Sequence, residues 1–332
     1  MGTGLHRYGQ YVKTNMKRDQ LCHVSIPDAK YHNDVLHPCV RYIPEGFNNH
    51  QWWMVQSPWY QCNDQIENPI LFYGDTEIDG TPPLHWHFAD VVIDTHTQGY
   101  NSDPTLHYSH DTLTVVWREF QTPKTKGLGY NSALYAITYD HLFNKSVPKF
   151  LIGEPSKVHL TDLSPCINKQ GDIYTIDYQI DHSVLWLPHK IISKLSRIFK
   201  YPVTWDKTQG VIIYAKTNNT YHPIETLTFK CKKKIIPWHF ELLEYNKKEF
   251  YIIYCRHTQN LYLGIRQGNY IHINPRPLYS NTQPLNTYKA GGIIINDILY
   301  LYYTNKTDLT DPNKNILHRA SIDLNQYICE DL

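Results

Sequence analysis

The chain has 332 residues, enough for one large single-core domain or two ordinary ones, and its formal charge of +1 gives it no general attraction to nucleic acid or acidic membranes. Its seven scattered cysteines include no Cys-x-x-Cys pair, which argues against a disulfide framework or a cysteine zinc site. Only 19% of the residues are charged, whereas 14% are aromatic, so the composition favours strands over helices and indicates an all-β fold.

The first thirty residues contain no apolar core of signal-peptide length. A run of about 18 apolar residues, as a membrane-spanning helix requires, occurs nowhere in the chain. We therefore expect synthesis in a cytoplasm, without a signal peptide and without membrane insertion. Residues 1–30 also have no hairpin partner of their own. They are expected either to lend a strand that closes the fold or to form an arm that docks elsewhere.

From residue 31 onward, one pattern recurs five times. Two runs of about six residues rich in Val, Ile and Tyr flank a short turn, which is the signature of a β-hairpin. The five hairpins are expected over residues 37–58, 101–119, 163–180, 238–255 and 288–304.

The spacing of the hairpins leaves room for two further strands in each unit. Candidate strands lie at 70–73, 132–139, 211–215, 261–273 and 316–323, and a helical pattern over 190–199 indicates an insertion in the third unit. Four-stranded sheets repeated around an axis avoid exposed edges. The prediction is a five-bladed β-propeller over residues 31–332, with antiparallel blades around a central funnel.

Short motifs near the hairpins sharpen this prediction. In chain order they are His37-Pro38-Cys39-Val40, Glu67-Asn68-Pro69, Ser102-Asp103-Pro104, Leu163-Ser164-Pro165, Pro237-Trp238-His239 and Gly291-Gly292. The series resembles the five-bladed propellers of the arabinanase, levansucrase and invertase superfamily, above all those of glycoside hydrolase family 43. The resemblance covers residues 30–323.

This resemblance implies an inverting active site in the funnel. Blade one carries a carboxylate base, blade three a glutamic acid, and blade two an aspartate that tunes the pKa of the acid. An inverting pair needs about 6.5 to 9.5 Å between its carboxyl groups to admit a water. Asp103 matches the blade-two aspartate, although an aspartate before proline also caps turns. The base position falls at Cys39 and the acid position at 163–164, so two of the three catalytic groups are replaced.

The strand order of a four-stranded blade places several polar loops on the same face as Asp103. Candidate substitutes for the missing carboxylates are Asp34, Glu67, Glu119 and Asp162. Candidate ligand-binding residues are Trp59, Tyr60, Asp64, Glu67, Asp103, Arg118, Trp238 and His239. Exposed rings in this set offer an apolar platform to a sugar. No cofactor and no metal site are expected, with a channel ion near His239 as the alternative.

Three functions fit the pattern. The leading hypothesis is a carbohydrate-recognising, hydrolase-like propeller with lost or weak catalysis, of the kind found in phage tail and receptor-binding proteins. Its expected partners are a cell-surface or polymeric glycan and other virion proteins, and a homo-oligomer is compatible with this hypothesis. The expected location is the virion, and the alternative location is the cytoplasm. The competing hypotheses are an active inverting glycoside hydrolase acting on a polysaccharide and a purely structural virion protein.

Overall fold

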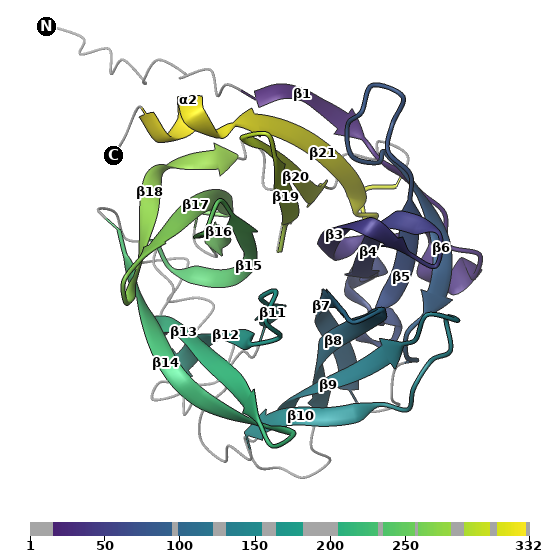
Figure 1. Ribbon diagram of the computed structural model, residues 1–332, viewed down its shortest axis with the longest axis horizontal. Coiled ribbons are helices and arrows are strands. Elements are labelled where there is room, and N and C mark those ends of the chain that lie inside the picture. Colours follow the sequence, from purple (N-terminus) through teal and green to yellow (C-terminus); the bar gives the residue numbers. More distant parts are fainter. Residues whose placement is uncertain are drawn as a thin grey trace, which may run out of the picture.

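The computed structural model describes residues 16–94, 99–121, 131–154, 164–181, 205–231, 235–255, 258–279, 289–305 and 311–329. Within these ranges the chain is mostly β-strand, and Figure 1 shows the strands as sheets set around a common centre. The fold is an all-β propeller, as the sequence predicted. The expected helix over 190–199 and the candidate carboxylate Asp162 lie outside the described residues.

The first two sheets run from the centre outward in chain order (Figure 1). The first consists of β3 (Leu36–Phe47), β4 (His50–Ser57), β5 (Ile70–Gly74) and β6 (His85–Val91), with the short β2 (His23–Val24) at its outer edge. The second consists of β7 (Gly99–Ser109), β8 (Thr112–Gln121), β9 (Asn131–Tyr139) and β10 (Lys149–Glu154).

An eight-stranded sheet follows, made of two antiparallel four-stranded units. One unit contains β11 (Pro165–Ile167), β12 (Ile173–Asp181), β13 (Trp205–Thr217) and β14 (Thr220–Lys230). The other contains β15 (Pro237–Tyr245), β16 (Lys248–Cys255), β17 (Asn260–Gln267) and β18 (Tyr270–Tyr279). A short parallel pairing of β14 with β18 joins the two outer edges.

The last sheet joins the two ends of the described chain. It contains β19 (Gly291–Ile295), β20 (Ile298–Asn305), β21 (Ile316–Asp323) and, at its outer edge, β1 (Met16–Leu21). Because β1 pairs with β21 while the adjacent β2 pairs with β6, the N-terminal segment links the last sheet to the first. Residues 16–24 thus add strands to the last and the first sheet, whereas residues 1–15 lie outside the described residues.

Turn chemistry explains why the hairpins form where the sequence predicts them. Two successive residues have positive φ at Asn48-Asn49, His110-Asp111, Asn218-Asn219, Asn246-Lys247 and Asn296-Asp297. Such pairs form the type I′ turn, whose twist matches that of the flanking strands, and Asn and Asp tolerate it best. The candidate strand 261–273 is split in two by another turn, where Gly268 has a φ of +60° between β17 and β18.

The hydrophobic core lies between sheets. Among the described residues, five clusters of buried apolar side chains each join two neighbouring four-stranded units, and one of them joins the last unit to the first. Trp53 and Trp117, for example, are completely buried between the first two units. Each unit therefore packs on both faces, as a closed ring of sheets requires.

The helices are short. Three 3-10 turns, η1 (Ala29–Tyr31), η2 (Tyr60–Cys62) and η3 (Asp64–Ile66), lie in the first unit and the segment before it, and α2 (Leu324–Cys329) follows β21. None of the described helices combines the length and the apolar character needed to cross a bilayer.

Candidate functional site

Each of the inner strands β3, β7 and β11 has a proline corner, where one polar residue precedes a proline. The corners are His37-Pro38 and Ser164-Pro165 at the starts of β3 and β11, and Asp103-Pro104 in the middle of β7. At the corners of His37 and Asp103 the strand pairing is bulged, and these two residues have φ values of +54° and +51°. This left-handed backbone is unfavourable for residues other than glycine, and more so before proline, so each corner costs about 1 to 3 kcal/mol. Such strain persists where the surrounding structure holds it and often marks a functional site.

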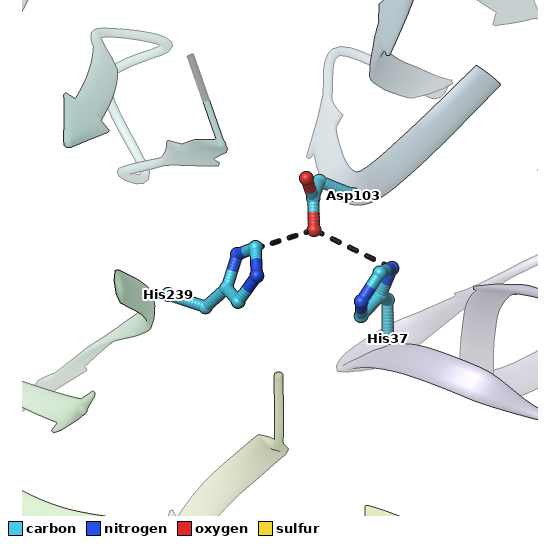
Figure 2. Close-up of side chains that lie close together, drawn as sticks. All are labelled: His37, Asp103 and His239. Atoms are coloured by element: carbon cyan, nitrogen blue, oxygen red, sulfur yellow. Dashed lines mark ion pairs between the residues drawn. The ribbon is translucent and has the colours of Figure 1, made fainter. Parts of the chain in front are cut away.

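The corners bring three side chains together at the axis. The possible metal-ligating atoms of His37, Asp103 and His239 all lie within 4.8 Å of one another. Figure 2 shows the Asp103 carboxylate between the two imidazole rings, and its Oδ1 lies 3.4 Å from Nδ1 of each histidine. All three residues are buried, and Asp103 is completely inaccessible to solvent.

Neighbouring polar groups fix this arrangement. Arg118, from β8, binds Asp103 Oδ2 at 2.9 Å and donates to the Ser102 hydroxyl at 2.7 Å. The hydroxyl groups of Ser57 and Ser164 lie 3.4 and 3.3 Å from Nδ1 of His37 and His239, respectively. These hydroxyl groups contact the same ring nitrogens that face Asp103, so they restrict the orientation of both imidazoles.

Burial and charge set the protonation states. Burial lowers the pKa of His37 to about 3, against the opposing effect of the Asp103 carboxylate. Burial by itself raises the pKa of Asp103, but neighbouring basic groups, above all the Arg118 guanidinium, outweigh burial and hold this pKa below its usual range. At neutral pH the site therefore offers an ionised carboxylate beside a neutral imidazole on His37.

The donor set fits a divalent metal ion. A nitrogen and an oxygen that each lie about 2.1 Å from a tetrahedral zinc ion are about 3.4 Å apart. Two of the three separations match this value, those between Asp103 Oδ1 and each histidine nitrogen. The three atoms together span up to 4.8 Å, so the two histidines would have to move closer to each other to bind one ion. Asp103 Oδ1 is also a buried oxygen that receives no hydrogen bond from the residues the structure describes. Two imidazoles and one carboxylate suit zinc and other first-row transition metals, and they leave coordination positions for water or substrate.

A second set of polar residues lies two positions further along the same strands. We call His37, Asp103, Ser164 and His239 the Asp103 layer, and Cys39, Thr105, Cys166 and Glu241 the Glu241 layer. Glu241 is completely buried, binds Arg41 at 2.8 Å and lies 3.6 Å from Lys289 Nζ. The Cys39 thiol donates to Glu241 at 3.4 Å and the Cys166 thiol at 3.6 Å. Because burial raises the pKa of both cysteines, they remain thiols.

The mapping of the blade-one position onto Cys39 is corrected by the local geometry. Cys39 belongs to the Glu241 layer, whereas His37 shares with Asp103 the positive φ, the following proline and the bulge. His37 therefore occupies in the first unit the place that Asp103 occupies in the second. The sequence already showed that His37-Pro38 repeats the motif of Asp103-Pro104. The resemblance, however, implied a carboxylate at this position, and His37 is not a carboxylate.

The structure brings some of the predicted residues to Asp103. Arg118 and His239 contact it directly, and Glu67 Oε1 lies 3.8 Å from His37 Nδ1. Glu119 follows Arg118 on β8, so its side chain points to the opposite face of the strand. The ring of Trp238 lies 4.6 Å from that of His239.

Asp34 and the predicted aromatic loop form a separate cluster. Asp34 is completely buried and accepts hydrogen bonds from the backbone of Trp59 and from both the backbone and the side chain of Asn315. Its carboxylate joins two loops, and both of its oxygens accept hydrogen bonds there. Trp59 donates its indole N–H to Asp64 at 2.9 Å, and Tyr60 stacks on His32 with ring centres 3.9 Å apart.

This aromatic loop is linked to the site through the chain itself. The 3-10 turn η3 begins at Asp64, next to Trp59, and ends immediately before Glu67.

Two further aromatic rings, which the sequence did not indicate, lie near Arg118. Tyr100 and Phe120 stack with ring centres 4.7 Å apart, and the guanidinium of Arg118 lies over Tyr100.

The charges also bear on glycosidic chemistry. An inverting glycosidase needs one carboxyl group that retains its proton and donates it to the leaving oxygen. Asp103 is ion-paired with Arg118 and has a lowered pKa, so it is not itself that acid, which agrees with the pKa-tuning place that the resemblance gives it.

No protein-family model and no curated protein matches the chain. Solved structures share its fold. An N-acetylgalactosamine deacetylase from F. plautii, in complex with blood group B trisaccharide, has a TM-score of 0.66 over 92% of this chain and 94% of that one, at 13% identity.

A GH43_1 enzyme from Xanthomonas citri, complexed with xylose, has a TM-score of 0.57 over 87% of both chains at 8% identity. An α-L-arabinanase from Penicillium chrysogenum, complexed with arabinobiose, has a TM-score of 0.51 over 90% of this chain and 78% of that one at 11% identity. At these identities the likeness is one of fold. The chain has the β-propeller fold of carbohydrate-active enzymes that include glycoside hydrolase family 43, as the resemblance implied.

Proposed function

We propose that the chain is a metal-dependent hydrolase that removes the acetyl group from an N-acetylated sugar. The observation that carries this proposal is the cluster of His37, Asp103 and His239, with its 3.4 Å separations and an Asp103 oxygen that receives no hydrogen bond from the described residues. In the reaction, the C–N bond of the amide breaks, the water oxygen enters acetate, and the sugar nitrogen gains a proton.

A divalent ion at this cluster supplies Lewis acidity toward a carbonyl oxygen and lowers the pKa of water. The residues of the chain supply the rest. Arg118 holds Asp103 through Oδ2 and leaves Oδ1 facing the histidines. Glu67 is the carboxylate that lies 3.8 Å from His37, and we assign it the role of general base, taking a proton from water and returning it to the amine.

The similar structures support a carbohydrate substrate. Of the three described above, the N-acetylgalactosamine deacetylase has the highest TM-score and the largest coverage of this chain. A metal ion held by two histidines and one carboxylate can also hydrolyse the amide bond of an N-acetyl group, and this reaction does not require a protonated carboxylic acid. The rings of Trp238 and Tyr100 lie next to His239 and Arg118, where they can contact the apolar face of a sugar.

The test is an assay that separates amide from glycosidic cleavage. The chain is stripped with EDTA, reloaded with Zn²⁺, Mn²⁺ or Co²⁺, and incubated with p-nitrophenyl glycosides of N-acetylgalactosamine and N-acetylglucosamine. We expect acetate without p-nitrophenol, loss of acetate in EDTA, and no activity in Asp103→Asn. The control, Asp111→Asn at the far end of the same hairpin, retains activity.

Each other outcome overturns the proposal in a defined way. Release of p-nitrophenol that survives EDTA supports the inverting glycosidase. Binding of N-acetylated sugars without turnover under any metal supports recognition without catalysis. A location in a virion stays a separate proposal, tested by mass spectrometry of purified particles.

A further inference from the structure

Lys289 is a fully buried lysine at the start of the fifth four-stranded unit. Lys289 stands two residues before Gly291. The same spacing separates each residue of the Asp103 layer from its counterpart in the Glu241 layer, so Lys289 holds the equivalent position in the fifth unit. Burying an ammonium group is costly unless its protons are satisfied. The contacts that satisfy it therefore indicate what the residue does.

Two of these contacts are backbone carbonyls at the proline corners. Lys289 Nζ donates to Pro104 O at 3.3 Å and to Pro165 O at 3.1 Å. These carbonyls belong to the residues directly after Asp103 and Ser164. One ammonium group thus fixes the backbone that orients the Asp103 carboxylate and the Ser164 hydroxyl, which in turn lies 3.3 Å from the His239 ring nitrogen.

The same segment also touches the third corner. A Cβ added at Gly291 would lie within hard contact of Pro38 O, so only glycine allows this approach to the corner that carries His37. Residues 289–291 therefore contact the corners of His37, Asp103 and Ser164, although the segment contributes no ligand of its own.

We propose that Lys289 is a positioning residue for the metal site, and that its contacts with Pro104 O and Pro165 O hold Asp103 and Ser164 in the geometry that binds the ion. This inference rests on the proposed function. In this proposal the fifth unit affects metal affinity without contacting the ion directly.

Arg41 provides a matched control. Both Arg41 and Lys289 are cations that contact Glu241, but Arg41 donates to the carbonyls of Val40 and Leu106, away from the corners. Removal of either cation leaves Glu241 less well paired and lowers stability. Only removal of Lys289 releases the corners.

The experiment measures Co²⁺ binding by its visible absorption, together with urea unfolding, in the wild-type chain, Lys289→Met and Arg41→Met. We expect Lys289→Met to weaken Co²⁺ binding by about 10- to 100-fold and to shift the absorption bands, as loss of supporting groups around metal ligands does elsewhere. Arg41→Met should bind Co²⁺ within about threefold of wild type.

Equal Co²⁺ affinity in Lys289→Met and wild type overturns the inference while the proposed function stands. So does an equal loss of affinity in Arg41→Met. A wild-type chain that binds no metal overturns the proposed function and the inference with it. If Lys289→Met does not fold, the comparison uses Lys289→Gln and Arg41→Gln, because glutamine retains a donor for one carbonyl and should show an intermediate affinity.

Discussion

The Asp103 layer and the Glu241 layer are built from the same inner strands, two residues apart, yet their polar groups are satisfied very differently. In the Glu241 layer one buried carboxylate faces two cations and two thiols. In the Asp103 layer one carboxylate oxygen faces two imidazoles and receives no hydrogen bond from the described residues. The difference indicates that the Glu241 layer holds the strands together, whereas the Asp103 layer is arranged for a ligand.

The largest expected effect concerns the Glu241 layer. Glu241→Gln removes the counter-charge that Arg41 and the fully buried Lys289 share, so we expect the free energy of unfolding to fall by about 3 to 5 kcal/mol. Urea denaturation measures it. The control is Glu225→Gln, because the Glu225 side chain is 27% exposed and its partner Arg266 also pairs with Glu249. A loss of about 1 kcal/mol or less is expected there. Equal losses in the two variants would contradict the structural role of the Glu241 layer.

The next effect concerns metal binding by the Asp103 layer. His239→Gln removes one of three ligands, so we expect metal affinity to fall by about 100-fold or more, with little change in stability of the metal-free chain. Isothermal titration calorimetry with Zn²⁺ measures the affinity. His107→Gln, on β7 four residues past Asp103, is the matched control and should bind normally. Unchanged binding by His239→Gln would remove this residue from the site.

The pH dependence of stability distinguishes the layers further. The pKa of His37 is about 3 in the folded chain and about 6.5 when unfolded, so the unfolded state binds more protons between these values. In EDTA, stability should therefore fall as the pH drops below about 6.5, with about 2 kcal/mol lost at pH 5. His37→Gln should remove this loss, whereas His110→Gln, in an exposed turn, should retain it. Parallel pH curves for wild type and His37→Gln would show that His37 is not buried as a neutral ring.

The smallest effect concerns the aromatic loop. If Trp59 contacts the sugar beyond the reacting group, Trp59→Ala should weaken binding of an N-acetylated oligosaccharide by about 5- to 10-fold and leave metal affinity unchanged. Fluorescence titration measures the sugar affinity. Tyr42→Ala, which removes an exposed ring on β3, serves as the control. No change in Trp59→Ala would confine sugar contacts to the rings near His239 and Arg118.

The parts of the structure that the sequence predicted are those that depend on residues close together in the chain. Turn pairs such as Asn48-Asn49 and Asn296-Asp297 specify hairpins by themselves, so the strands and the propeller followed from short-range patterns. Asp103 was predicted from the family resemblance, and Arg118 from the strand order that places both residues on one face. His239 and Glu67 were also predicted, because both lie in motifs of the family resemblance.

The remainder depended on contacts between distant parts of the chain. Lys289 reaches Pro104 O across 185 residues, and Glu241 meets Arg41 across 200 residues. No short-range pattern signals such pairs. His37 was missed for a different reason, since its motif was visible but the family comparison directed attention to carboxylates. Only the fold shows that the Asp34 carboxylate accepts hydrogen bonds from Asn315 and Trp59.

The most direct test of the account is the metal content of the Asp103 layer. Purified chain is stripped with EDTA, titrated with Zn²⁺, and analysed for bound metal by mass spectrometry of the intact protein, alongside Asp103→Asn and Asp111→Asn. We expect one ion per chain in wild type and in Asp111→Asn, and none in Asp103→Asn at the same free Zn²⁺ concentration. A wild-type chain that binds no ion, or an Asp103→Asn chain that binds one as tightly as wild type, would contradict the account.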